Sequence, residues 1–198
     1  MLTEEQRHIR TGKFTGSEIY KLMGAKVLGK TGETYIYEKA AEFLTGEPCT
    51  PEFSSAATTW GNEKEPEAKA HLIAATRCEI IEPGTISNEM ICGTPDGIIN
   101  DAILEIKCPY NSSNHLRNLL LEDAEGLLDL HPEYYWQIVS YLWLMDLKKA
   151  KFCSYDPRYK EAQKMLILNF ELNLVHLVLL KNRVTEAKLM FNNIISKL

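Results

Sequence analysis

The feature that most constrains this chain is a pair of short apolar segments, residues 96–99 and 102–108, separated by Asn100 and Asp101. Asparagine and aspartate tolerate the positive φ angles of a tight turn, so the stretch predicts a β-hairpin with a two-residue loop. In that register residue 99 pairs with 102, 98 with 103, 97 with 104, and 96 with 105. Asp96 then lies directly opposite Glu105, with their Cβ atoms about 5 Å apart.

This hairpin would gather charged groups on one face of a sheet. Side chains alternate along a strand, so Glu105 and Lys107 share a face while Leu104 and Ile106 point towards a core. Facing carboxylates are destabilising unless neutralised, and a divalent cation, Mg²⁺ or Mn²⁺ rather than zinc, would neutralise them. Such a centre fits phosphodiester hydrolysis, with Lys107 orienting or deprotonating a water or stabilising the developing charge. The alternative is an exposed hairpin whose charges are simply solvated, because this spacing is loose.

The rest of the chain predicts helices on both sides of a cluster of strands. The predicted helices are 4–9, 18–23 with Ser17 as N-cap, 33–45 ending at Gly46, 57–75, 112–121, 133–147 and 172–197. The predicted strands are 79–82, 90–92, 96–99, 102–108, 152–155 and 165–170, with loops at 24–32 and 46–55. This order predicts an α/β (α+β) fold, a mixed central sheet flanked by helices, in one domain spanning residues 1–198.

Two of these helices show a candidate buried face. In the helix 33–45, one face carries Tyr37, Ala40, Ala41 and Leu44. In the helix 172–197, the three/four spacing of a buried face is followed by Leu177, Leu180, Val184, Ala187, Phe191 and Ile194.

Composition excludes several classes of protein. The chain has 198 residues, 45% hydrophobic and 25% charged, which is typical of an ordinary globular protein. No apolar run reaches the roughly 18 residues of a membrane span, and the polar start is not a secretory signal. Five cysteines without a CxxC pair argue against a disulfide framework, a zinc knuckle or an iron–sulfur cluster, and predict reduced thiols. His71, His115 and His131 stand singly, which predicts structural or solvated roles.

The net charge of −5 is unexpected for a chain that acts on DNA, because non-specific affinity for DNA comes mainly from lysine and arginine. Bound divalent cations and local basic patches can reconcile an acidic total with a DNA substrate.

Five segments, in this order, resemble motifs of the phage lambda exonuclease family, also called the YqaJ-like viral recombinases. They are Arg10-Thr-Gly-Lys-Phe-Thr-Gly-Ser17, Trp60-Gly-Asn-Glu-Lys-Glu65-Pro-Glu-Ala68, Thr94-Pro-Asp96-Gly97 with Leu104-Glu105-Ile-Lys107-Cys-Pro109, Tyr135-Trp-Gln137-Ile-Val-Ser-Tyr141, and Tyr155-Asp-Pro-Arg158. Together they run from residue 10 to residue 158, about three quarters of the chain. The chain departs from the family before the first motif, where it offers few aromatic or basic residues to handle a DNA end.

The resemblance implies a catalytic centre. Its metal ligands would be the carboxylates of Glu65, Asp96 and Glu105 and the carbonyl oxygen of Ile106, and Lys107 would be the catalytic lysine. Without the resemblance, Glu65 is simply one of three closely spaced glutamates that a helix would expose to solvent.

The resemblance also implies residues around that centre. Gln137 would be a further catalytic residue, supported by Tyr141 one turn later on the same helix face. Arg10, Ser17 and Thr94 would line a pocket for a DNA 5′-phosphate, and a helix start at Ser17 suits an anion. The alternatives are a polar pair at the edge of the core for Gln137 and Tyr141, a surface charge for Arg10, and plain N-capping for Ser17.

A nuclease of the PD-(D/E)XK superfamily, with a restriction-endonuclease-like core, is therefore implied. The expected activity is a Mg²⁺-dependent (Mn²⁺ may substitute) 5′→3′ exodeoxyribonuclease that converts duplex DNA ends into 3′ overhangs for phage-type recombination. The resemblance implies a homotrimeric ring and a single-strand annealing partner. It also implies a protein encoded by a phage or prophage that acts in the cytoplasm of a bacterial host, and no membrane association is expected. Two alternatives stay open: a site-specific endonuclease on the same core, and a non-catalytic DNA-binding module.

Overall fold

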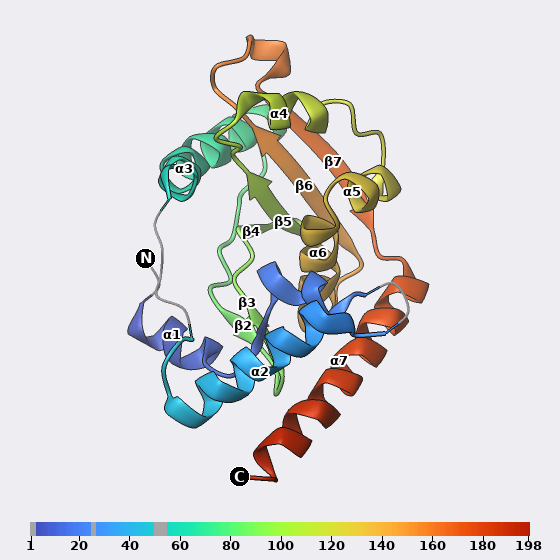
Figure 1. Ribbon diagram of the computed structural model, residues 1–198. Helices are drawn as coiled ribbons and strands as arrows, with labels where there is room; N and C mark the ends of the chain where they lie inside the picture. Colours follow the sequence, from blue (N-terminus) through green and yellow to red (C-terminus); the bar gives the residue numbers. More distant parts are fainter. Residues whose placement is uncertain (1–2, 25–26, 50–54) are drawn as a thin grey trace.

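The computed structural model describes residues 3–24, 27–49 and 55–198. Its main sheet has four strands in the order β4 (Gly97–Ile99), β5 (Ala102–Lys107), β6 (Lys149–Tyr155) and β7 (Met165–Glu171). β5 runs parallel to β6, whereas β4 with β5 and β6 with β7 are antiparallel, so the sheet is mixed. The predicted fold class, a mixed sheet flanked by helices, is confirmed (Figure 1).

The predicted hairpin forms β4 and β5. Its pairs are Gly97 with Leu104, Ile98 with Ile103, and Ile99 with Ala102, as the sequence predicts. Asn100 takes a left-handed conformation (φ 57°), which asparagine tolerates better than most residues.

A second, smaller sheet has the order β1 (Phe14–Thr15), β3 (Ile91–Gly93) and β2 (Ile86–Ser87). Only β3 is predicted by the sequence, because two-residue strands are too short to show a period. The predicted strand 79–82 is wrong: the only bridge reported there joins Ile81 to Ile98.

Each predicted helix is present, although most of them begin or end at other residues than predicted. Their bounds are α1 (Glu4–Arg10), a 3-10 helix η1 (Gly16–Leu22), α2 (Gly29–Thr45), α3 (Ala56–Thr76), α4 (Ser112–Asn118), α5 (Ala124–Leu130), α6 (Pro132–Met145), a 3-10 helix η2 (Glu161–Gln163) and α7 (Leu174–Ile195). α5 is not predicted from the sequence. The predicted loop 24–32 partly joins α2, and both predicted loops extend into residues outside the described part of the chain.

Side-chain caps fix several helix starts. Thr3 and Gln6 form a capping box at α1, Ser55 accepts from the N–H of Thr58 at α3, and Asn173 caps α7. Gly46 ends α2 in the left-handed conformation, as predicted. Ser17 is not an N-cap: the 3-10 helix starts at Gly16, two residues before the predicted start, and no side chain caps it.

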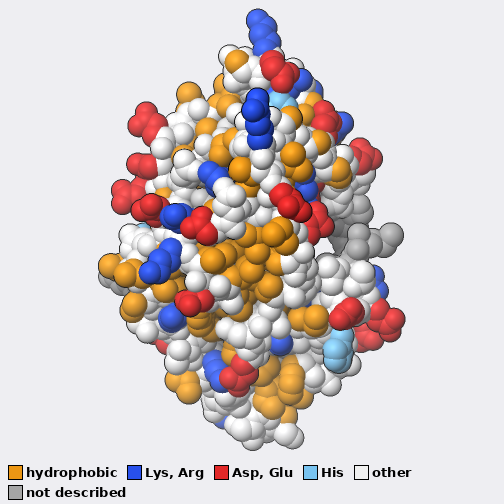
Figure 2. Space-filling view, turned by 180° about the vertical axis from the view of Figure 1, so that it is seen from behind, with side chains coloured by type: hydrophobic (Ala, Val, Ile, Leu, Met, Phe, Trp, Pro, Cys, Tyr) orange, Lys and Arg blue, Asp and Glu red, His pale blue; other side chains and the backbone are white. Residues whose placement is uncertain are grey.

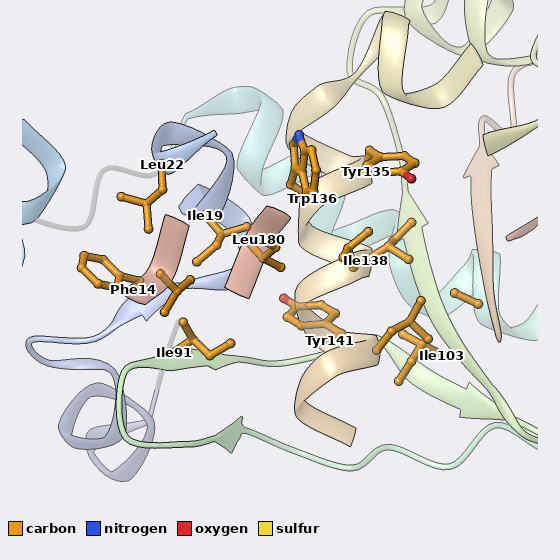
Figure 3. Close-up of a cluster of buried hydrophobic side chains, with 14 of the residues drawn as sticks. Phe14, Ile19, Leu22, Ile91, Ile103, Tyr135, Trp136, Ile138, Tyr141 and Leu180 are labelled. Carbon is orange, nitrogen blue, oxygen red and sulfur yellow. The ribbon is translucent and has the colours of Figure 1, made fainter. Parts of the chain in front are cut away.

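The two faces of the main sheet pack against different helices. Ile103 and Phe152 face a large core with residues of α2, α6 and α7, part of which is shown in Figure 3. Leu104 and Ile106 face a smaller core built with Ala68 and other residues of α3. Figure 1 shows α3 on one flank of the sheet and α5 and α6 on the other. The prediction that Leu104 and Ile106 point into a core is confirmed.

The predicted buried face is confirmed for α7, whereas the predicted apolar face of α2 is fully buried only at Ala40. In α7, Leu180, Val184, Ala187 and Phe191 are buried. In α2, Tyr37 and Leu44 are exposed, and the buried face instead carries these residues: Gly32, Tyr35, Ile36, Lys39, Ala40 and Glu42. Hydrophobic periodicity misses this face because part of its burial comes from a Lys39–Glu42 ion pair of 3.0 Å.

The remaining expectations from composition concern cysteines, histidines and membrane spans. The five cysteines are free, and Cys49 is the exposed one among them. His115 is buried, with Nδ1 2.8 Å from Ser154 Oγ and Nε2 2.8 Å from the carbonyl oxygen of Gln163, which is a structural role. Over the described residues, no helix combines the length and apolarity needed to cross a membrane.

Candidate active site

Strand β5 ends in the two charged residues that the sequence singles out. Glu105 is 1% exposed and Lys107 is half-buried on the same side of the strand. The Lys107 Nζ lies 2.6 Å from Glu105 Oε1. The other carboxylate oxygen, Glu105 Oε2, is buried and has no hydrogen-bond partner in the described chain. A buried oxygen without a partner is costly, so this position is suited to an additional cation or donor.

Asp96 lies beside Glu105 and Lys107, but it is not paired with Glu105 across the strands as predicted. β4 begins at Gly97, so Asp96 is not a ladder partner of Glu105. Instead its Oδ2 accepts a hydrogen bond of 2.6 Å from the backbone N–H of Ile106. Pro95 before it has no N–H to continue the ladder, and the carboxylate takes the place of a backbone acceptor. Both acids still meet at the end of β5.

The acids at this site are held in an environment that disfavours their charge. Burial, together with the charge of Glu105, raises the pKa of Asp96 well above its ordinary value. Burial likewise raises the pKa of Glu105, although Lys107 opposes the shift. Burial alone would lower the pKa of Lys107, but the charges of Glu105 and Asp96 outweigh it and raise that pKa. Lys107 therefore carries its proton at neutral pH beside these carboxylates.

Helix α6 supplies the next layer of the site. Lys107 Nζ donates to Gln137 Oε1 at 3.4 Å, and Gln137 Nε2 donates to the hydroxyl of Tyr141 at 3.0 Å. The same ammonium lies 4.8 Å from the ring centre of Tyr134. Tyr134 is not among the predicted site residues, although it lies three residues before Gln137 and hence on the same helix face.

Tyr141 also connects the two sheets. In Figure 3 it points from α6 towards the segments that carry Phe14 and Ile91, in β1 and β3 of the smaller sheet. A Cβ added to Gly93 would lie 2.1 Å from Tyr141 Cε1, and one added to Gly16 would lie 2.4 Å from the same atom. Only glycine at both positions leaves room for the ring, so the two glycines fix where the Tyr141 hydroxyl stands.

Glu65 lines a cavity of about 430 Å³ together with Asp96, Ile106 and Lys107. Its carboxylate lies 2.9 Å from Lys69 Nζ. Within residues 3–24, 27–49 and 55–198, no three acidic, histidine or cysteine side chains already stand at metal-binding spacing. Glu65 is thus near the acids of β4 and β5 but is paired with its own helix.

The three residues expected at a phosphate pocket are not joined by any contact. Arg10 lines a cavity of about 120 Å³ with Arg7, Thr15 and Lys39, and neither Ser17 nor Thr94 lines it. Ser17 Oγ is exposed and lies 3.4 Å from Thr15 Oγ1. Thr94 Oγ1 lies 3.0 Å from Thr85 Oγ1. Lys39 is not predicted as a neighbour of Arg10, because it lies on a different helix, α2, and comes near only in the folded chain; Arg7 lies three residues before Arg10 on α1.

Comparison with known proteins places this geometry in context. A family model described as the YqaJ-like viral recombinase domain matches residues 6–148. No curated protein sequence matches the chain closely enough to count as a relative. Among solved structures, the alkaline exonuclease LHK-Exo from Laribacter hongkongensis is similar with a TM-score of 0.85 and 25% identity, covering 98% of this chain and 95% of that one.

Two further structures show the same fold. LHK-Exo in complex with dAMP has a TM-score of 0.85 and 26% identity, again covering 98% and 95% of the two chains. A phage related exonuclease from Haemophilus somnus 129PT has a TM-score of 0.76 at 18% identity, covering 93% of this chain and 96% of that one.

Proposed function

Because the chain belongs to the YqaJ-like viral recombinase family, we propose that it is a metal-dependent 5′→3′ exodeoxyribonuclease. It would hydrolyse one strand of a linear duplex from a 5′-phosphorylated end and leave a 3′ overhang for recombination. The family match and the similar exonuclease structures support a nuclease of exonuclease type. The observation that carries the proposal is the group of Asp96, Glu105 and Lys107 at the end of β5, beside an open cavity.

The residues present fit a divalent cation. Asp96, Glu105 and Glu65 offer carboxylate oxygens and Ile106 a carbonyl oxygen, the donors that Mg²⁺ and Mn²⁺ prefer. The buried Oε2 of Glu105 has no partner in the described chain, and burial raises the pKa values of both Asp96 and Glu105, with the neighbouring carboxylates adding to the shift. A cation there would give the Oε2 atom of Glu105 a partner and would stabilise the charged forms of both carboxylates. Glu65 would join the centre by leaving Lys69, so we propose that it is the adjustable ligand.

The chain's own residues have distinct parts in the reaction. A bound Mg²⁺ supplies polarisation of the phosphoryl oxygens and acidifies the attacking water. Lys107, as a fixed ammonium, would stabilise negative charge that develops on the phosphate, which favours this role over proton abstraction. Gln137, held by the Tyr141 hydroxyl, would keep Lys107 in place. Recognition of the 5′-phosphate by Arg10, Ser17 and Thr94 is proposed on the family resemblance, and Arg10 would contribute the positive charge.

Assembly and partners are part of the proposal. A homotrimeric ring would enclose the duplex, and a single-strand annealing protein would receive the 3′ overhang in the cytoplasm of a phage-infected bacterial host. Exposed apolar side chains on α7, including Leu174, Val175 and Val178, offer surface for such association. Figure 2 shows hydrophobic side chains gathered near the centre of one face of the molecule. Sedimentation of a monomer at micromolar concentration would contradict the ring.

The direct test is digestion of a linear duplex labelled on either strand, with and without a 5′-phosphate, beside the same DNA as a closed circle. The reactions contain Mg²⁺ or EDTA, and Lys107→Ala is run in parallel. We expect Mg²⁺-dependent loss of 5′-phosphorylated strands, intact circles, and an inactive variant. Cut circles would instead establish a site-specific endonuclease, and DNA binding without digestion would establish a non-catalytic module.

A further inference from the structure

Helix α3 carries Glu65 but is weakly anchored where Glu65 lies. The fully buried residues of the helix, Ala68 and Leu72, belong to its second half. The first half lines the active-site cavity with Ala57, Thr58, Gly61 and Asn62 and buries no side chain fully. Burial therefore fixes the first half of the helix less firmly than the second, because most helical stability in proteins comes from packing of a buried face.

The segment Tyr155–Arg158 makes two contacts with this helix, one before Glu65 and one after it. At one point, the Tyr155 hydroxyl donates to Glu67 Oε1 at 2.9 Å. Tyr155 is 2% exposed and is the last residue of β6, directly after Ser154, which pairs with Lys107. The Tyr155 hydroxyl is therefore fixed relative to the catalytic strand.

At the other point, the Arg158 guanidinium lies 4.6 Å from the ring centre of Trp60, at the start of the helix. Asp156 is fully buried and holds this guanidinium through two contacts of 2.7 Å, Nε to Oδ1 and Nη2 to Oδ2. The Nη2 atom also donates to the carbonyl oxygens of Pro109 (3.2 Å) and Tyr110 (3.0 Å), in the loop that follows β5. The planar fork thus joins β6, that loop and α3, which a lysine could not do.

These two attachment points lie on either side of Glu65. At a rise of about 1.5 Å per residue, Trp60 and Glu67 are roughly 10 Å apart along the axis. Resting on the function proposed above, we propose that Tyr155 and Arg158 are positioning residues that set the distance of Glu65 from Asp96 and Glu105. They act through α3 and touch neither the cavity nor the catalytic pair.

The consequence is a defined effect on the affinity for divalent cations. Loss of a residue that orients a metal ligand typically weakens metal binding about 10- to 100-fold. Arg158→Lys keeps the charge but loses the fork and the stacking on Trp60. Tyr155→Phe removes only the hydroxyl and keeps the buried ring. The matched control is Lys160→Ala, which removes an exposed positive charge two residues from Arg158.

The experiment is titration of the full chain with Mn²⁺ alone, followed by calorimetry, with circular dichroism to verify folding. Arg158→Lys and Tyr155→Phe are each expected to weaken Mn²⁺ binding about 10- to 100-fold, and Lys160→Ala to leave it unchanged. The same two substitutions are made in a Glu65→Gln background, where little further weakening is expected because the ligand they position is already lost.

Three results would overturn the inference. Unchanged Mn²⁺ affinity in both variants would show that the two contacts do not position a ligand. An equal loss in the Glu65→Gln background would show that the effect does not pass through Glu65. Absence of Mn²⁺ binding by the unsubstituted chain would overturn the proposed metal centre as well, which separates that failure from the other two.

Discussion

Replacing Gly93 with alanine should disable the catalytic centre without touching any charged residue. The new Cβ would lie 2.1 Å from Tyr141 Cε1 and 3.0 Å from its hydroxyl oxygen, whereas ordinary contacts begin at 3.4 Å. The ring must therefore move by about 1.3 Å, the difference between the first and last of these distances. Its 3.0 Å hydrogen bond from Gln137 would lengthen to as much as about 4.3 Å, beyond hydrogen-bonding range.

The expected size of the effect follows from this displacement. Overpacking of a buried site costs about 1–3 kcal/mol, so the free energy of unfolding should fall by that amount. In a chain of 198 residues this lowers the melting temperature by about 2–4 °C per kcal/mol. A misplacement of about 1 Å near a reacting centre can cost about 100-fold in rate, so kcat should fall far more than stability explains.

The assay pairs urea unfolding with cleavage of a labelled linear duplex. Gly16→Ala tests the opposite side of the same ring, because its Cβ would lie 2.4 Å from Tyr141 Cε1. Gly126→Ala in α5 is the control, since its Cβ would make only an ordinary contact of 3.5 Å. Wild-type unfolding and wild-type kcat in Gly93→Ala would refute the view that the two glycines place Tyr141 and, through it, Gln137.

Three other predictions concern charge and histidine. Lys107→Met should lower stability by about 3–5 kcal/mol at pH 8, measured by urea unfolding in EDTA, because the buried carboxylate of Glu105 loses its partner. His115→Ala should cost about 2–4 kcal/mol of stability, measured the same way, by leaving a cavity and removing the hydrogen bonds to Ser154 and to the carbonyl oxygen of Gln163, while kcat of the folded enzyme stays near wild type. The third concerns pH: the raised pKa of Asp96 in the folded state contributes stability that is present below its unfolded pKa and is lost as pH rises through the folded value. In EDTA at pH 8, the free energy of unfolding of Asp96→Asn should therefore exceed that of wild type, and the difference should vanish near pH 4. Mg²⁺ should raise the melting temperature of wild type but not that of Asp96→Asn.

The hairpin shows how much local sequence can determine. The turn at Asn100 and the alternation along β5 are local properties, so the register and the shared face of Glu105 and Lys107 are predictable from sequence. Asp96 is the limit of that reasoning. Continuing the pairing of β4 with β5 would place Asp96 opposite Glu105. Because Pro95 has no N–H to donate, β4 begins one residue later than predicted, at Gly97.

Other features depend on partners that sequence spacing does not reveal. The buried face of α2 is partly polar because Lys39 and Glu42 neutralise each other. A hydrophobic pattern therefore selects the wrong side of that helix. Similarly, Arg158 matches a motif, but its contacts with Trp60 and the loop after β5 join positions far apart in the chain. Such roles emerge only when the fold brings those segments together.

The two cores on either side of the main sheet suggest a division of the site's tasks. Lys107 and Gln137 lie on the side of the large core with α6, whereas Glu65 is carried by α3, the helix that packs in the small core. Substitutions in the large core should therefore act on the position of the ammonium and change kcat at saturating metal. Substitutions in the small core should move Glu65 and change the metal concentration required. Asp96, between the two, should affect both, because its carboxylate is fixed to the backbone of β5 while it lines the shared cavity.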